Sequence, residues 1–141
     1  MNALYQQFFK DCASANIDWA ADTIKVALLN SSHTFTYTNT VWSDVSANEI
    51  SGTEYTSGGQ ALTNAVVELD TSANQVFLKA DDVTWGSEAA PATLIAYYAV
   101  LYNATRGNKL IASLDFGGEQ QVTSGAFKIA FNSSLGVITL K

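Results

Sequence analysis

Short runs of β-branched and aromatic residues recur along this chain, and clusters of Gly, Ser, Asn and Asp separate them. Runs that end so soon at turn-forming residues are typical of antiparallel strands, because a buried helix needs a longer apolar pattern. The sequence therefore predicts an all-β fold, either a jelly-roll-like antiparallel β-sandwich or a β-barrel, since both give the same alternation. The predicted strands are residues 23–29, 65–69, 75–79, 95–102, 109–116, 126–131 and 137–140.

The clusters between these strands predict how neighbouring strands are joined. Residues 70–74, 103–108 and 132–136 are each short enough to close a hairpin between the strands on either side. The glycine pairs at 58–59 and 117–118 lack the Lys and Ser or Thr of a phosphate-binding loop. We therefore expect them to be turn glycines with positive φ.

The predicted strand 95–102 has apolar side chains on both faces. Such a strand lies either at the centre of a sandwich or in a sheet whose outer face meets another subunit. The second arrangement is favoured, because only 14% of the residues are charged and a soluble monomer usually has about a quarter charged. One face carries Ala96, Tyr98, Val100 and Tyr102, and the other carries Tyr97, Ala99 and Leu101.

The N-terminal segment has the periodicity of a helix. Leu4, Phe8 and Cys12 recur every four residues and form one apolar stripe. This predicts a single short N-terminal α-helix over about residues 3–14, with Asn2 as its N-cap. Because Cys12 falls on the stripe, it is expected to be a small buried side chain.

Length, charge and hydropathy exclude several classes of protein. The 141 residues favour a single β domain over residues 1–141, in which Pro91 lies in a connector. With 7 Lys and Arg against 13 Asp and Glu, the chain lacks the basic surface that nucleic acid requires. No apolar run approaches the roughly 20 residues of a membrane span, and the N-terminus does not resemble a signal peptide. We therefore expect neither nucleic acid nor membrane as a partner, and synthesis in the cytoplasm.

Residues that could carry chemistry are few. One cysteine, Cys12, excludes an internal disulfide and a cysteine-built zinc site, and His33 is the only histidine available to a catalytic triad. A histidine in this loop is expected to be a surface residue or a hydrogen-bonding partner. Asp81 and Asp82 lack the surrounding spacing of a calcium loop, so they are interpreted as a solvated turn or a cap. No catalytic, cofactor-binding or metal-binding residue is predicted, and the chain is not expected to be an enzyme.

Trp19, Trp42 and Trp85 raise the question of a carbohydrate platform, because exposed aromatic rings stack on sugars. Trp42 and Trp85 stand beside small polar residues at the expected ends of elements. That setting favours half-buried packing residues over a sugar-binding face.

Several contiguous segments resemble virion proteins encoded in the structural modules of tailed phages. The longest is residues 40–62, which reads TVWSDVSANEISGTEYTSGGQAL. The others, in order, are residues 22–29, 80–85, 96–100, 115–118 and 125–129. The resembling segments are therefore spread, in order, along most of the chain, from residue 22 to residue 129. Proteins of this family are described as minor structural, cement, decoration or head-fibre proteins.

The resemblance implies a small β domain that sits on the capsid surface of the virion as a homo-oligomer, typically a trimer. It implies the major capsid protein as partner, synthesis in the cytoplasm of a host bacterium, and neither cofactors nor catalytic residues. Such a protein clamps neighbouring capsid subunits or forms the base of a short fibre. Because the sequence ends at Lys141, a compact capsid decoration or cement protein is favoured over a fibre.

A symmetric oligomer on a shell binds through several copies of one patch, so that modest contacts add up. The predicted helix is a candidate for that patch, because it has more apolar surface than a lone helix on a sheet needs, from Leu4, Tyr5, Phe8 and Phe9. The alternative is that the helix simply closes one open end of the sandwich.

Two other functions remain as alternatives. The first is a head-fibre or tail-associated module that binds host-surface glycans through the polar loops at 36–39 and 53–56. The second is a glycan hydrolase that uses a pair of carboxylates such as Glu49 and Glu54. The absence of any recognisable active-site pattern makes the hydrolase the less favoured of the two.

Overall fold

A computed structural model describes residues 2–141 of the chain. Strands dominate the described residues, and they are accompanied by one α-helix and two 3-10 helices. The elements, in chain order, are β1 (Ala3–Leu4), α1 (Gln6–Ala13), β2 (Ile24–Leu29), η1 (Trp42–Asp44), η2 (Ser46–Asn48), β3 (Gln60–Ala61), β4 (Val66–Asp70), β5 (Gln75–Lys79), β6 (Val83–Trp85), β7 (Ala92–Asn103), β8 (Lys109–Gly125), β9 (Phe127–Ile129) and β10 (Ile138–Leu140).

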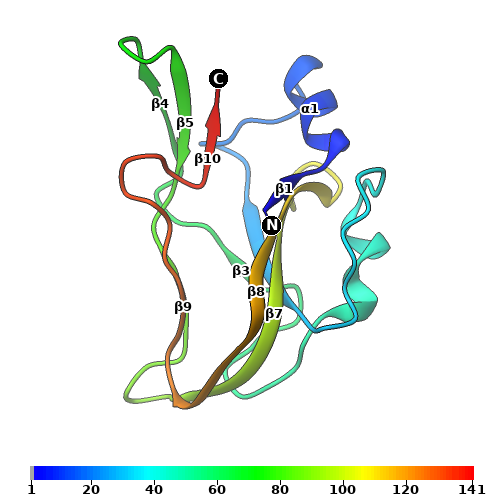
Figure 1. The fold of residues 1–141 in the computed structure, drawn as a ribbon, viewed down its shortest axis with the longest axis vertical. Helices are drawn as coiled ribbons and strands as arrows, with labels where there is room; N and C mark the ends of the chain where they lie inside the picture. Colours follow the sequence, from blue (N-terminus) through cyan, green and yellow to red (C-terminus); the bar gives the residue numbers. More distant parts are fainter. Residues whose placement is uncertain (1) are drawn as a thin grey trace.

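The strands form three antiparallel sheets in a sandwich-like arrangement. The largest sheet has the order β1-β8-β7-β2-β3, the second has the order β10-β5-β4, and the third pairs β6 with β9. Figure 1 shows β4, β5, β10 and β9 on one side of the molecule, the long strands β7 and β8 in the middle, and α1 with the loop that follows β2 on the far side. The predicted all-β fold with one short N-terminal helix is confirmed, and each sheet ends at free edges, as in a sandwich.

The main core lies between the layer of β7 and β8 and that of β4, β5, β9 and β10. On the side of the large sheet, Leu94, Ala96 and Leu101 of β7 are at most 1% exposed. The expectation that Ala96 shares a face with Val100 is wrong, because an irregularity in the pairing between Ala96 and Tyr98 changes the alternation. Helix α1 adds Phe8, and burial of an aromatic side chain of this size contributes about 1.5–3 kcal/mol. From the opposite layer the core receives Leu78, Val83, Trp85, Phe127, Ile129 and Ile138.

The outer face of β7 is covered by other parts of the same chain. Val100 and Tyr102 lie on this face and are at most 3% exposed. The side chains packed with them come from the helix start and from the loop that follows β2: Tyr5, Phe35, Trp42 and Val45. The expectation that this face meets another subunit is therefore wrong, since the chain supplies its own cover.

Two of the predicted hairpins are confirmed and the third is wrong. The turn at 70–74 joins β4 to β5, and the turn at 103–108 joins β7 to β8. The turn at 132–136 connects strands of different sheets, because β9 pairs with β6 and β10 pairs with β5. The reason is a long-range bond: the Val137 N–H donates to the Leu78 carbonyl oxygen at 2.8 Å, which carries the chain across to β5.

The N-terminal segment also departs from its prediction. Residues 3–4 form a short edge strand on β8, and the helix begins only after Tyr5. Asn2 does not cap the helix; its side-chain oxygen accepts a hydrogen bond from the Asp115 N–H at 2.9 Å. The buried face of α1 carries Gln7, Phe8 and Asp11, and the Gln7 amide donates to the Asp11 carboxylate at 2.8 Å.

Cys12 is therefore exposed rather than buried. The helix packs on the face centred on Phe8 and its neighbours Gln7 and Asp11, so that Cys12 turns toward solvent. Because Gln7 and Asp11 bond to each other, their polar groups are buried without losing a partner.

Candidate interaction surface

The hairpin of β4 and β5 is stabilised locally. The two strands pair along their whole length, from Val66 opposite Lys79 to Asp70 opposite Gln75. At the turn, the Asp70 carboxylate accepts hydrogen bonds from the Ser72 hydroxyl and N–H and from the Ala73 N–H. These bonds, led by that of the Ser72 hydroxyl, lower the pKa of Asp70. The turn is therefore held by hydrogen bonds within the hairpin itself.

This hairpin exposes apolar side chains along its outer strand. Val66, Val67 and Leu69 are 43%, 50% and 74% exposed. Leu78, which is paired with Val67, is only 6% exposed and belongs to the core. In Figure 1 the hairpin projects past the end of β10. Its apolar surface thus begins in the core and continues beyond it into solvent.

The outer edge of β4 has no neighbouring strand in its sheet. The Glu68 carboxylate on this strand contacts the Lys79 amino group at 2.6 Å, so the hairpin carries an internal ion pair as well. An apolar strand with a free edge is a template for pairing with another chain. The β4–β5 hairpin is the first candidate interaction surface.

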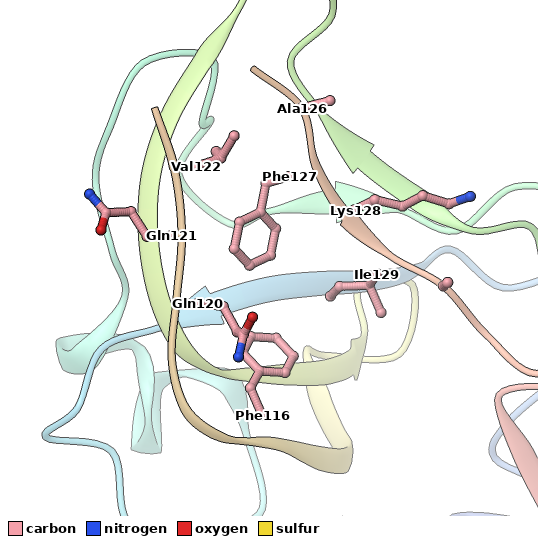
Figure 2. A pocket seen from close by; sticks show the side chains of 9 residues that line it. Phe116, Gln120, Gln121, Val122, Ala126, Phe127, Lys128 and Ile129 are labelled. Carbon is pink, nitrogen blue, oxygen red and sulfur yellow. The ribbon is translucent and has the colours of Figure 1, made fainter. Parts of the chain in front are cut away.

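A second unpartnered feature runs along the open side of the sandwich. β1 pairs with β8 only at residues 112–113, and the outer edge of residues 116–125 has no strand beside it in the described chain. A hollow of about 420 Å³ lies between this edge and β9. Figure 2 shows Val122 and Phe127 between the two strands, whereas Gln121 and Lys128 point away.

This hollow is one end of a longer groove. Two further hollows follow it toward β1 and β10, and each shares lining residues with the one before. Phe116 and Ile129 line both the first and the second, and Leu114 and Val137 line both the second and the third. We call this feature the side groove. Its walls are the free edge of β8 and the segments of β9 and β10.

A wide bulge shapes the β8 wall of the groove. Ala96 and Tyr98 of β7 are two residues apart, but the residues of β8 that pair with them, Gln120 and Asp115, are five residues apart. The predicted positive φ of the glycine pairs is confirmed, and residues 117–118 in this bulge have φ of 76° and 147°. The extra residues lengthen this stretch of β8 relative to β7 and bend the strand locally.

Helix α1 offers less surface than the sequence suggests. Tyr5 and Phe8 are 0% and 1% exposed, so both belong to the core. Phe9 is 48% exposed. The expectation that Tyr5 contributes to a contact surface is wrong, and Phe9 remains as the exposed aromatic residue of this helix.

His33 is buried and hydrogen-bonded, which confirms the second of its two expected settings. Its Nε2 atom lies 3.2 Å from the Ser113 hydroxyl, and its ring packs edge-on against Tyr98. The Nδ1 atom is buried without a partner. Burial lowers the pKa of His33, and burial likewise raises the pKa of nearby Tyr5 to about 12, against a smaller opposing effect of Ser113.

Asp81 and Asp82 hold loops together, in keeping with their interpretation as a turn or cap. The Asp82 carboxylate contacts the Lys128 amino group at 2.8 Å and accepts a hydrogen bond from the Phe131 N–H at 2.8 Å. These contacts, led by that of Lys128, lower the pKa of Asp82. The Asp81 carboxylate accepts a hydrogen bond from the Asn64 amide at 2.6 Å.

The pair of carboxylates considered for a hydrolase is used differently. Glu49 accepts hydrogen bonds from the Tyr55 hydroxyl at 2.8 Å, the Gly58 N–H at 2.6 Å and the Ser57 hydroxyl at 3.2 Å. Glu54 is exposed, at a φ of 64°. Burial, together with the Glu49 carboxylate, raises the pKa of Tyr55. Glu49 thus organises the loop between η2 and β3.

The aromatic residues considered for glycan binding are mostly engaged inside the fold. Trp19 and Trp85 are 4% and 1% exposed. Trp42 is half-buried, and its ring stacks on Tyr102 with the centroids 4.9 Å apart. In the two polar loops, Tyr37 is 50% exposed, whereas the Tyr55 hydroxyl also accepts the Leu28 N–H at 3.0 Å.

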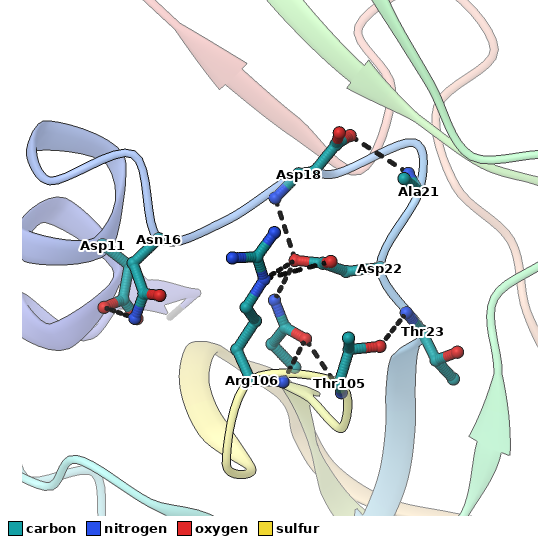
Figure 3. A network of polar contacts seen from close by, with 9 residues as sticks. Asp11, Asn16, Asp18, Ala21, Asp22, Thr23, Thr105 and Arg106 are labelled. Atoms are coloured by element: carbon teal, nitrogen blue, oxygen red, sulfur yellow. Dashed lines mark hydrogen bonds and ion pairs between the residues drawn. The ribbon is translucent and has the colours of Figure 1, made fainter.

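Sequence reasoning missed a polar network at one end of β7. The Asp22 side chain, 4% exposed, accepts hydrogen bonds from the Arg106 guanidinium and the Asn103 amide (Figure 3). Burial opposes ionisation of Asp22, but these bonds and one from the Asp18 N–H outweigh it and lower the pKa. The network fixes the β7–β8 turn against the segment that leads into β2.

Searches for sites of other kinds gave negative results. Residues 2–141 contain no group of three or more His, Cys, Asp or Glu placed to hold a metal ion. Within the same residues no helix has the length and apolar character to cross a membrane. Comparison of the chain with protein-family models, curated proteins and solved structures found no match.

Proposed function

We propose that this chain is a phage virion structural protein that decorates the outside of the capsid and stabilises the shell as a homo-oligomer. The observation that carries the proposal is the exposed apolar strand β4, with Val66, Val67 and Leu69 open to solvent. Only 14% of the residues are charged, which is low for a soluble monomer. These are properties of a protein that works in an assembly. The resemblance of residues 40–62 to tailed-phage virion proteins supplies the context.

The partner in this proposal is the major capsid protein, and the oligomer is a trimer on the capsid surface. Each protomer presents the same patch to the shell, and the second and third contacts form at a high effective concentration. Because the oligomer binds assembled subunits and not dissociated ones, binding raises the stability of the shell by mass action. No residue of the chain has to perform chemistry for this role.

Helix α1 supplies a candidate for the shell contact. Phe8 is part of the core, and Phe9 beside it is exposed. Closing the end of the sandwich and contacting the shell can therefore fall to two neighbouring side chains of the same helix. Phe9 is 48% exposed and lies next to Phe8 with the ring centroids 6.0 Å apart. Substitution Phe9→Ser removes the exposed ring and leaves the buried one in place.

The proposal is tested with empty shells of the phage that encodes the chain, prepared from a mutant lacking it. Purified protein added to these shells should bind saturably, raise their melting temperature, and give density at three-fold or quasi-three-fold positions in cryo-electron microscopy. Failure to bind, or density on the tail alone, would contradict it. A glycan array probed with the same protein addresses the alternative function directly.

The variant Phe9→Ser refines the outcome. Weaker shell binding at unchanged subunit stability would assign α1 to the contact. Unchanged binding would leave α1 with the closing role alone and direct attention to other faces of the oligomer.

A further inference from the structure

Two surfaces of this chain lack a partner, and their chemistries are complementary. One is the strand β4 at the edge of its hairpin, and the other is the side groove between β8 and β9. We propose that β4 of one copy lies in the side groove of a second copy, in a head-to-tail contact. The inference rests on the proposed function, from which it takes the homo-oligomer. It adds which surfaces of two neighbouring copies are in contact.

The groove has the features that recognise an extended chain. The outer edge of β8 at residues 116–125 is free in the described structure, so its main-chain groups can pair with a further strand. Apolar side chains line the space between this edge and β9, where they can receive alternate side chains of the incoming strand. These are Phe116, Val122, Phe127 and Ile129.

Strand β4 has the features of the matching ligand. Its own outer edge is free, its 5 residues are fewer than those of the free edge of β8, and it spans about 17 Å when extended. Val67 and Leu69 are on one face, since successive side chains alternate. Both are at least half exposed. Placed in the groove, they would be removed from water against the aromatic rings that line it.

Charge is compatible with the same pairing. The chain as a whole is acidic, with a net charge of −6, so two copies repel over most of their surfaces. The first hollow of the groove carries one charged lining residue, Lys128, whose side chain is 54% exposed and already contacts Asp82. Strand β4 carries Glu68 and Asp70. Lys128 points away from the hollow and Glu68 already contacts Lys79, so these charges are compatible with docking, and the apolar and main-chain contacts carry it.

The contact joins two different surfaces, which fixes the kind of oligomer it can build. A contact between unlike patches is heterologous, and it closes into a ring when the rotation between neighbours divides a full turn. A ring of three would use every β4 and every groove. A pairing of β4 with β4 of another copy would instead be isologous and would stop at a dimer.

The test is a mixing experiment with two variants that each disable one surface. Leu69→Asp disables the strand, and Gln120→Trp fills the groove from an exposed position on β8. A second groove variant, Ala126→Trp, fills the same hollow from another exposed position. Tyr37→Asp, at a side chain that is also 50% exposed, is the control for an added charge elsewhere. Circular dichroism checks that each variant is folded.

Light scattering then gives the mass of each sample. The wild type and Tyr37→Asp should be trimers of the 15.1 kDa chain, and the strand and groove variants should each be monomers. An equal mixture of Leu69→Asp and Gln120→Trp should give a dimer, because one strand and one groove remain intact between them. This restored mass is the result that only a head-to-tail contact predicts.

Other results overturn the proposal. A monomeric wild type, a mixture that stays monomeric, or groove variants that remain oligomers would each exclude the head-to-tail contact. The last result, with Leu69→Asp monomeric, would indicate an isologous pairing of β4. The mixing experiment contains no shells, so it tests the contact between copies alone. A trimer that passes it but does not bind shells would contradict the decoration function and not this contact.

Discussion

Glu49 shows how a single side chain can organise a loop that has little regular structure. Its carboxylate binds donors from Tyr55, Ser57 and Gly58, and Tyr55 in turn accepts the N–H of Leu28 in β2. We predict that Glu49→Gln destabilises the protein by about 1–3 kcal/mol, because hydrogen bonds to a charged acceptor are lost or weakened. Urea denaturation measures the difference.

The matched control for this prediction is Glu54→Gln. Glu54 is exposed and lies in the same loop, so its substitution should change the free energy of unfolding by no more than ~0.5 kcal/mol. Equal losses from Glu49 and Glu54 would contradict the organising role of Glu49. Loss of a glycan-hydrolysing activity in either variant would instead revive the hydrolase hypothesis.

His33 makes the stability of the fold depend on pH. Burial beside Ser113 and Tyr98 lowers its pKa in the folded state, whereas in the unfolded chain it titrates near 6.5. Between these two values the unfolded chain binds more protons, so acid favours unfolding. The contribution of His33 is therefore complete above about pH 6.5 and is lost as the pH falls through the folded-state pKa.

We predict that the unfolding free energy of the wild type declines as the pH falls below about 6.5, and that His33→Gln flattens this decline. The carboxylates with lowered pKa, Asp22 and Asp82, act in a separate window below about pH 3.9, where their stabilising charge is neutralised. Urea titrations across the pH range distinguish the two windows. An unchanged slope in His33→Gln would remove His33 as the cause.

At the scale of elements, the glycines preceding β3 and within β8 serve different purposes. Gly59 and Gly117 have nearly the same φ, 77° and 76°. A side chain at Gly59 would collide with the Val26 carbonyl of β2, while at Gly117 nothing lies within 4 Å. We predict that Gly117→Ala costs about 1–2 kcal/mol of backbone strain.

Gly59→Ala should cost the same strain plus the collision, at least ~1–3 kcal/mol more. Thermal unfolding of both variants at one concentration provides the comparison. Because the backbone conformations match, the difference between the two variants measures how tightly the connection to β3 packs on β2. Equal losses would mean that this connection can move away without cost.

Local and distant interactions explain which elements could be predicted. The turns at 70–74 and 103–108 close between adjacent strands, so their residues alone indicate hairpins. The strands β1, β3 and β6 have only 2 or 3 residues, and their partners rather than their sequences define them. The third predicted hairpin failed for the same reason, because a bond to Leu78 redirects the chain.

The candidate surface was harder to predict than the fold. Val66, Val67 and Leu69 are residue types that also fill the core strands, but they are exposed on a hairpin that projects past β10. Conversely, the apolar outer face of β7 suggested an interface, but scattered aromatic residues such as Phe35 and Trp42 cover it. Those aromatic residues do not recur at a regular spacing along the sequence, so no pattern indicates which face they cover.

At the scale of the whole molecule, valency is expected to dominate shell binding. A trimer that makes three weak contacts binds far more tightly than one protomer, because the later contacts form within one complex. The monomeric variants Leu69→Asp and Gln120→Trp retain the fold and any shell contact outside the hairpin and groove. We predict that both bind empty shells ~100-fold more weakly than the wild type, as measured by co-sedimentation.

The two variants also separate valency from direct contact. If valency is the cause, they lose affinity equally, although one lies on β4 and the other on β8. A loss confined to Leu69→Asp would mean that the hairpin itself contacts the shell. Binding by both variants at wild-type strength would show that one protomer suffices, and shell stabilisation, about 2.7 kcal/mol at a hundredfold excess over Kd, would then not require the ring.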